Sequence, residues 1–225
     1  MRSIVPPPAA GDDRPPGRMS GQVRVWCLRH AEAQNVTAGI AGAADATRPL
    51  TARGRRQAIA AAQTLAGEPI NSIYCSTALR ARQTAEILAA ALAVDVVPLP
   101  ELVEVGVGER VLRAWVVERD LGLRVADGES GYEVVARVTA AFRRIAGVHP
   151  GETVAVVGHV ASLTVALGRL CALGARVWGT PLPHARPFLV EWDGQTWQCP
   201  AWPGAVDETS AQRTDFDNED PVKRF

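Results

Sequence analysis

The 225-residue sequence lacks a net charge, a cysteine-pair motif and a long apolar run. Its 24 Lys and Arg residues balance 24 Asp and Glu residues, so no broad electrostatic field favours nucleic acid or an anionic membrane as a partner. It also has no basic run with an aromatic platform of the kind that binds single-stranded nucleic acid. No stretch approaches the roughly 20 apolar residues of a membrane-spanning helix. We therefore expect neither nucleic acid nor a membrane as a partner.

Disulfide and zinc frameworks are also missing. The sequence contains four cysteines in apolar stretches without C-x-x-C spacing, namely Cys27, Cys75, Cys171 and Cys199. This pattern predicts buried thiols in a reducing compartment. The N-terminus has a proline run from Pro6 to Pro8 and then Asp12 and Asp13, and it lacks the apolar run of a secretory signal. We expect a cytoplasmic protein.

The sequence does contain enough apolar material for one domain. Hydrophobic residues make up 47% and charged residues 21%, as in ordinary globular proteins. Residues 1–21 hold five of the 16 prolines and predict a disordered N-terminal tail. Residues 205–225 are polar and acidic and predict a flexible C-terminal tail. The folded domain is therefore expected at residues 22–204.

Apolar, β-branched segments alternate with helical patterns along this domain. The expected strands cover residues 23–28, 70–76, 94–97 and 153–157, and the expected helices cover residues 51–66, 79–92, 134–145 and 162–173. Asp193 and Gly194 then predict a tight turn between strands 188–192 and 196–198. Such alternation indicates a layered α/β domain.

Reactive side chains follow three of the expected strands. Arg29 and His30 come directly after the first strand. Arg80 comes shortly after the second strand, and His159 follows the strand that ends at residue 157. Ligands of α/β sheets bind outside the carboxyl ends of the strands, so these groups could share one pocket. Cationic and imidazole groups together suit an ionised phosphate monoester, which needs its charge neutralised before a nucleophile can approach phosphorus.

These residues carry a resemblance to a known family. The sequence resembles the histidine phosphatase superfamily, also called phosphoglycerate-mutase-like, and more closely its phosphatase branch. The resemblance spans residues 23 to about 192 and rests on six motifs in the family's order, which are Leu28–Ala33, Pro49–Ala58, Ser76–Ala85, Leu102–Gly108, Gly128–Arg137 and Val156–His159. It implies a three-layer α/β/α single domain with a mostly parallel central sheet.

The resemblance also implies a role for five residues. His30 aligns with the nucleophile that forms a phosphohistidine, and Arg29 and Arg80 align with the residues that bind the phosphoryl oxygens. His159 would complete the charge clamp. Glu104 aligns with the acid that protonates the leaving oxygen and then activates water. The family requires neither a metal nor a cofactor for this reaction, so we expect none.

The sequence departs from the family's pattern next to these positions. Ala31 and Val160 replace glycines that usually follow the two histidines, and Ala33 replaces a common Ser or Thr. The family often has an Asn six residues beyond the nucleophile, whereas Asn35 lies five beyond His30. Asn35 is therefore an open candidate for a phosphate ligand. We expect activity, with an altered rate or specificity as an open alternative.

Several alternatives stay open from the sequence. Glu101 and Glu109 flank Glu104 and compete with it for the role of acid. His149 is expected in an exposed turn, and His184 is a weaker candidate for the pocket rim. The leading function is a phosphatase for a small phosphate ester, with a phosphoglycerate-mutase-type enzyme and a catalytically impaired phospho-ligand-binding module as alternatives. The hairpin near the C-terminus permits a homodimer.

Overall fold

A computed structural model describes residues 21–35, 46–124, 128–179 and 181–203 of the chain. The expected tails, 1–21 and 205–225, lie outside these residues except for Gly21. Within the described ranges the chain forms one α/β domain around a six-stranded sheet with the strand order β3-β2-β4-β1-β5-β6. None of the described helices is long and apolar enough to cross a membrane.

The sheet is parallel over its first four strands. They are β3 (Asp95–Leu99), β2 (Ile70–Ser76), β4 (Thr153–Gly158) and β1 (Val23–Arg29), and β5 (Phe188–Trp192) and β6 (Trp197–Gln198) are added antiparallel at the far edge. Every residue of the central strand β4 is buried, as expected for a strand covered on both faces. The register pairs Arg29 with Gly158 and Cys75 with Val157, so β1, β2 and β4 end at the same edge.

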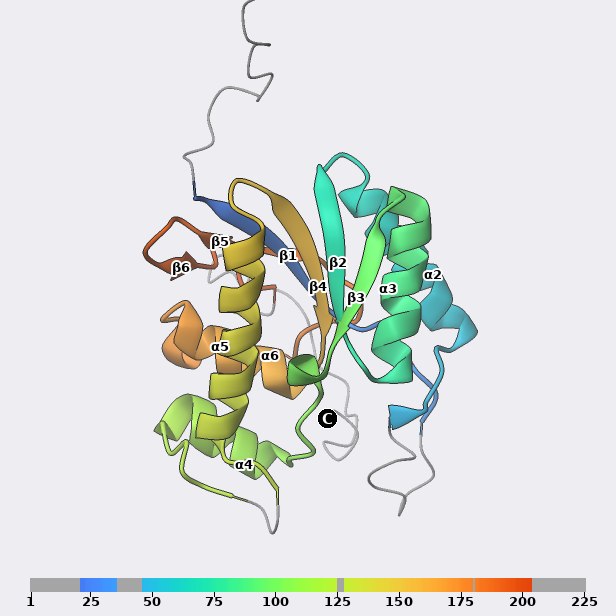
Figure 1. The fold of residues 1–225 in the computed structure, drawn as a ribbon. Coiled ribbons are helices and arrows are strands. Elements are labelled where there is room, and N and C mark those ends of the chain that lie inside the picture. Colours follow the sequence, from blue (N-terminus) through green and yellow to red (C-terminus); the bar gives the residue numbers. More distant parts are fainter. Residues whose placement is uncertain (1–20, 36–45, 125–127, 180, 204–225) are drawn as a thin grey trace, which may run out of the picture.

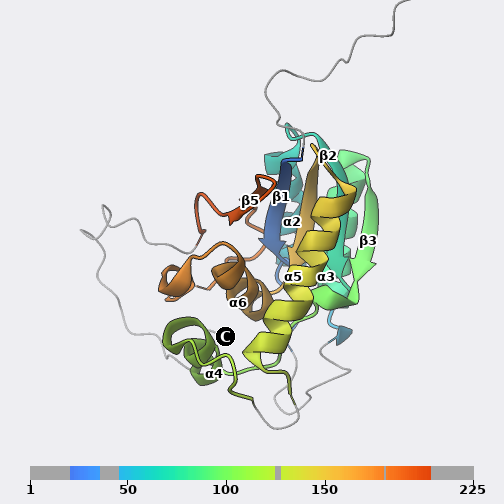
Figure 2. The ribbon, with the colours of Figure 1, turned by 60° about the vertical axis from the view of Figure 1, so that its left-hand side comes forward.

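Helices cover both faces of this sheet (Figures 1 and 2). One face is packed by α2 (Ala52–Leu65) and α3 (Leu79–Leu92), and the other by α5 (Gly131–Val148) and α6 (Val160–Leu170). Two hydrophobic cores result, an alanine-rich one under α2 and α3 and a bulkier one under α5 and α6 that contains Trp115 and Phe142. The three-layer α/β/α fold expected from the sequence is confirmed.

A glycine holds α2 against the loop that follows β1. Thr51 caps α2 by accepting a hydrogen bond from the Gly54 N–H at 2.9 Å. A Cβ atom at Gly54 would lie 2.0 Å from the carbonyl oxygen of Glu32, so any side chain there would push the helix away. Gln57 Oε1 also accepts from the Glu32 N–H at 2.9 Å. These contacts fix the backbone just after His30.

Two helices begin earlier than the sequence pattern predicts. Helix α5 begins at Gly131, because Ser130 and Glu133 form a capping box, and not at residue 134. Helix α6 begins at Val160, and not at residue 162, so Ser162 is inside the first turn and is not its cap. The sequence pattern could not show this start because the group that satisfies the first N–H groups of α6 comes from a distant segment.

Short helical segments between the motifs were missed by the periodicity. They are η1 (Pro100–Leu102), α4 (Glu109–Arg113), the π-helical η2 (Ala114–Glu118) and η3 (Gly174–Val177). Each has five residues or fewer, which is too short for a 3.6-residue period to become visible. In both ribbon views α4 lies below α6, beyond the carboxyl edge of the sheet (Figures 1 and 2).

The expectation of an exposed His149 was wrong. Its side chain is only 12% exposed. Its Nε2 lies 2.8 Å from the Tyr74 hydroxyl, and its Nδ1 lies 2.6 Å from Glu152 Oε2. His149 therefore ties the end of α5 to strand β2, away from the carboxyl edge.

Candidate active site

The first histidine is held with one ring nitrogen free of a proton. His30 follows β1, and its N–H donates to the carbonyl oxygen of Gly158 at 2.9 Å, which extends the β1–β4 pairing. Its Nδ1 lies 2.7 Å from the carbonyl oxygen of Ala31. Because a carbonyl oxygen can only accept, Nδ1 carries the proton and Nε2 keeps its lone pair. Arg80 Nε donates to that lone pair at 3.1 Å.

The second histidine lies on the other side of the same arginine. His159 Nδ1 accepts from Arg80 Nη2 at 3.3 Å, and its Nε2–H donates to Ser76 Oγ at 2.7 Å. The ring centroids of His30 and His159 are 5.1 Å apart. All three side chains are buried, with exposures of 6% for His30, 0% for His159 and 2% for Arg80. The structure thus joins residues from the ends of β1, β2 and β4 in one cluster.

Both imidazoles are held neutral. Burial lowers the pKa of His30 well below its ordinary value, and a positive charge on the neighbouring His159 ring or on Arg80 acts in the same direction, whereas the hydrogen bond to the Ala31 carbonyl oxygen acts against it. Burial likewise lowers the pKa of His159, with Arg80 and Arg29 acting in the same direction. A neutral imidazole with a free lone pair is the form that can act as a nucleophile.

Arg29 supplies a second guanidinium group, and one of its N–H donors has no hydrogen-bond partner among the described residues. Its Nη1 donates to the carbonyl oxygen of Leu182 at 3.0 Å. Its Nε is buried and makes no hydrogen bond within the described part of the chain. Buried donors are normally satisfied, so an unsatisfied one beside a second arginine suits an anionic ligand.

Glu104 reaches the same edge from the segment after η1. Its carboxylate accepts hydrogen bonds from the N–H groups of Ala161 at 3.2 Å and Ser162 at 2.9 Å. It is therefore the group that caps α6, one turn from His159. Burial raises the pKa of the Glu104 carboxyl, although the backbone N–H groups and Arg29 act in the opposite direction.

The two glutamates that competed with Glu104 lie elsewhere. Glu101 pairs with Arg144 at 2.8 Å on the outer side of α5. Glu109 is the exposed first residue of α4, and among the described residues it forms no hydrogen bond or ion pair with the imidazole cluster. The carboxylate that accompanies His159 is thus Glu104.

The candidate phosphate ligand Asn35 lies at the end of a described segment, and its role stays a prediction. It is exposed at the end of the described segment 21–35, and within the described residues it makes no hydrogen bond with His30, Arg29 or Arg80. Ala31 is fully buried, and its N–H donates to Thr84 Oγ1 at 3.0 Å. The methyl group that replaces a glycine hydrogen is therefore accommodated beneath the loop.

A third histidine, His184, contacts His30 directly, although the sequence made it only a weaker candidate for the pocket rim. His184 Nδ1 donates to the backbone carbonyl oxygen of His30 at 2.9 Å, and the two ring centroids are 5.4 Å apart. An isolated β-bridge pairs His184 with Arg29. The two histidines are 154 residues apart, so no local pattern could reveal the contact. Arg48 was also missed, and its charge acts on the pKa of both Arg29 and His159.

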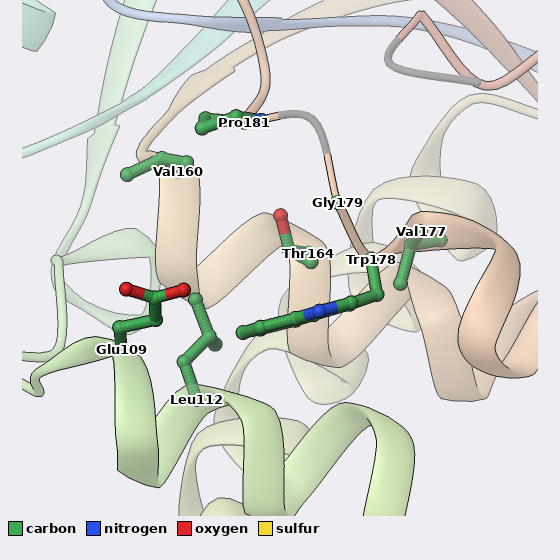
Figure 3. Close-up of a pocket in the computed structure, with 8 residues that line it drawn as sticks. All are labelled: Glu109, Leu112, Val160, Thr164, Val177, Trp178, Gly179 and Pro181. Carbon is green, nitrogen blue, oxygen red and sulfur yellow. The ribbon is translucent and has the colours of Figure 1, made fainter. Parts of the chain in front are cut away.

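A cavity of about 200 Å³ lies beside the first turns of α6, the helix that follows His159 (Figure 3). It lies between α4, the first turns of α6 and the segment after η3. Its lining consists of Glu109, Leu112, Val160, Thr164, Val177, Trp178, Gly179 and Pro181. Among the residues that the structure describes, no group of three His, Cys, Asp or Glu side chains could hold a metal ion.

Comparisons with known proteins agree with this arrangement. The model of the histidine phosphatase superfamily (branch 1) matches residues 25–203. The probable phosphoglycerate mutase GpmB of Photorhabdus laumondii is 28% identical over 210 residues, which cover 87% of this chain and 95% of that protein.

Solved structures share the fold. YhfR of Bacillus stearothermophilus superposes with a TM-score of 0.68 at 24% identity, covering 82% of this chain and 98% of that one. A mycobacterial glucosyl-3-phosphoglycerate phosphatase superposes with a TM-score of 0.64 at 22% identity, covering 82% and 100% of the two chains. With the family match over most of the domain, and with two histidines, two arginines and a glutamate at one sheet edge, the chain belongs to the histidine phosphatase superfamily.

Proposed function

We propose that this protein is a metal-independent phosphatase that hydrolyses a small phosphate monoester through a phosphohistidine at His30. The observation that carries the proposal is the position of Arg80 between the two neutral imidazoles, with Nε2 of His30 kept free of a proton. Arg29, Arg80 and His159 would bind the phosphoryl oxygens. A bound phosphoryl oxygen would replace the His30 lone pair as the acceptor for Arg80.

In the first step, the lone pair of His30 Nε2 attacks phosphorus and the ester P–O bond breaks. The departing oxygen takes a proton from the Glu104 carboxyl. Burial raises the pKa of the Glu104 carboxyl, which favours the protonated form needed for that transfer. The hydrogen bond from Nδ1 to the Ala31 carbonyl oxygen orients the ring and stabilises the positive charge that develops on it.

In the second step, the Glu104 carboxylate removes a proton from a water molecule as its oxygen attacks phosphorus. The N–P bond breaks and its electron pair returns to His30 Nε2. Inorganic phosphate leaves, and Glu104 is protonated again. The two steps therefore restore both residues to their starting states.

A mutase is the second candidate, because a relative is named a probable phosphoglycerate mutase. A mutase would return the phosphoryl group to another hydroxyl of its substrate instead of to water. The segment from Glu104 to the Gly128 motif is only about two dozen residues long. It is shorter than the insertion that the family resemblance associates with true mutases, and this favours hydrolysis.

The test is hydrolysis of an aryl phosphate in the presence of a chelator by the wild type and His30→Ala. We expect the variant to lose turnover. We also expect wild type quenched in alkaline denaturant, in which the acid-labile N–P bond survives, to carry one phosphoryl group on the peptide that contains His30, as seen by mass spectrometry at neutral to alkaline pH. His149→Gln is the matched control, because His149 lies away from the cluster. Equal rates for wild type and His30→Ala would refute the proposal, whereas phosphoglycerate isomerisation without phosphate release would favour the mutase.

A further inference from the structure

The cavity lining includes two residues that neighbour the phosphate cluster along the chain. Val160 lines the cavity and directly follows His159. Pro181 lines it as well and directly precedes Leu182, whose carbonyl oxygen accepts from Arg29. The cavity is therefore a candidate for the space that a group attached to a bound phosphoryl group occupies.

The chemistry of the lining is mostly apolar. Figure 3 shows the flat indole of Trp178 extending toward Leu112, with Val160 and Val177 on other sides. The hydroxyl of Thr164 points into the same space. Such walls favour a flat apolar group, because removing its surface from water and packing it against an aromatic ring are both favourable.

The charge of the lining is negative. Glu109 is the one charged residue among the described residues that line the cavity. Its side chain is exposed, its carboxylate faces the cavity in Figure 3, and it forms no ion pair or hydrogen bond with any described residue. A hydroxyl or ammonium group would therefore gain an acceptor here, whereas a carboxylate would meet a like charge.

We infer that this cavity binds the alcohol part of the substrate, and that it selects a flat apolar group bearing a hydroxyl or ammonium donor for Glu109. The inference rests on the proposed phosphatase function and names its substrate class. Esters whose alcohol carries a carboxylate, phosphoglycerates among them, are disfavoured, since no Lys or Arg lines the described cavity to pair with that charge.

The size of the cavity supports a small alcohol. Its volume of about 200 Å³ is below the range of about 300–1,000 Å³ for pockets that enclose a drug-sized ligand. One ring with a short substituent suits this space better than a nucleotide or a protein segment does.

Binding of phosphonates tests the inference without requiring turnover, because their C–P bond is not hydrolysed. The probes are benzylphosphonate and its para-aminomethyl and para-carboxylate derivatives, measured by calorimetry. We expect the wild type to prefer the aminomethyl over the carboxylate derivative. In Glu109→Gln this preference should fall about threefold to fivefold, the effect of one exposed charge pair. Glu118→Gln removes an exposed carboxylate from the adjacent η2 and should leave the preference unchanged.

The contribution of the indole is tested with Trp178→Ala and Trp178→Phe. The alanine variant should bind benzylphosphonate less tightly than the wild type does, with methylphosphonate binding unchanged. The phenylalanine variant, which keeps a flat ring, should recover most of the loss. Circular dichroism melting checks that each variant is folded.

The two proposals fail in different ways. Equal preference for the charged probes in wild type and Glu109→Gln would overturn the cavity assignment even if hydrolysis proceeds through His30. Full activity of His30→Ala would refute the phosphohistidine, while a Glu109-dependent preference among phosphonates would still support the cavity as the alcohol site.

Discussion

The candidate active site has a phosphoryl end and a cavity end, which differ in burial, in charge and in the secondary-structure elements that hold them. At the phosphoryl end, His30, Arg80 and His159 are at most 6% exposed and offer donors and positive charge. At the cavity end, apolar side chains and the exposed carboxylate of Glu109 face a space of about 200 Å³. The first end suits the part that all phosphate monoesters share. The second suits the part in which they differ.

The difference follows from the elements that build each end. The phosphoryl end is held where β1, β2 and β4 stop, so three paired strands fix its groups. The cavity end is built from α4 and the segment after η3, which have no strand behind them. We infer that catalysis depends on the first end and selectivity on the second, and that changes at the two ends should separate these properties.

Arg80→Ala should have the largest effect on this comparison. The change removes the donor that contacts both imidazoles, and it leaves a charge-binding site without one of its guanidinium groups. We expect kcat/KM for an aryl phosphate to fall about 10²–10³-fold, as for the loss of one transition-state donor. Steady-state kinetics with a melting curve for each protein provides the measurement.

Arg80→Lys is its matched variant. Lysine keeps the charge but cannot present the planar fork that reaches His30 and His159 together. We expect an intermediate rate, with the order of substrate preference unchanged from the wild type. A changed preference would show that the phosphoryl end also governs selectivity.

Glu104→Gln should have an effect that depends on the leaving group. Glutamine keeps one oxygen for the first N–H groups of α6 but cannot donate the acid proton. For an alkyl phosphate, whose alkoxide is a poor leaving group, kcat should fall about 10²-fold or more. For p-nitrophenyl phosphate the first step needs little protonation, so the loss should be smaller. An unchanged rate with alkyl phosphates would place the acid elsewhere.

The smallest expected effect is on stability at low pH. The native pKa of His159 lies well below the ordinary value of 6.5, so between these two values the unfolded chain binds more protons than the native one. Stability should therefore be unaffected by this group above pH 6.5 and should decrease as the pH falls below it. His30 acts in the same direction.

His159→Asn checks this dependence. We expect the difference in Tm between pH 7 and pH 5 to be smaller in the variant than in the wild type, in buffer without phosphate. Phosphate must be left out because an anion at the cluster would stabilise the protonated histidines. The same Tm difference in both proteins would show that His159 does not contribute to acid sensitivity.

Much of the phosphoryl end could be predicted from the chain. Arg29, His30 and His159 directly follow apolar strand patterns, and parallel strands bring their carboxyl ends to one edge. Glu104 was distinguishable from Glu101 and Glu109 only by resemblance. The contact of its carboxylate with the first turn of α6 supplies the physical reason for selecting it. A cytoplasmic location and a homodimer stay predictions.

The cavity end could not be predicted in the same way. Helix α4 has five residues, and Trp178 lies more than sixty positions along the chain from it. No periodicity connects them, because they come together only through tertiary packing, where both line one cavity beside α6. The contact of His184 with His30 could not be predicted either, because the two residues are 154 positions apart and meet only through tertiary packing.

The sequence by itself determined the layered fold and the chemical groups at the strand ends, because strand and helix periodicities are local and parallel pairing brings the residues after each strand to one edge. Only the tertiary structure decided which carboxylate caps α6, which histidine supports His30 and what charge faces the alcohol part of a substrate. These features depend on contacts between segments far apart in the chain, which side-chain packing selects and local pattern does not encode.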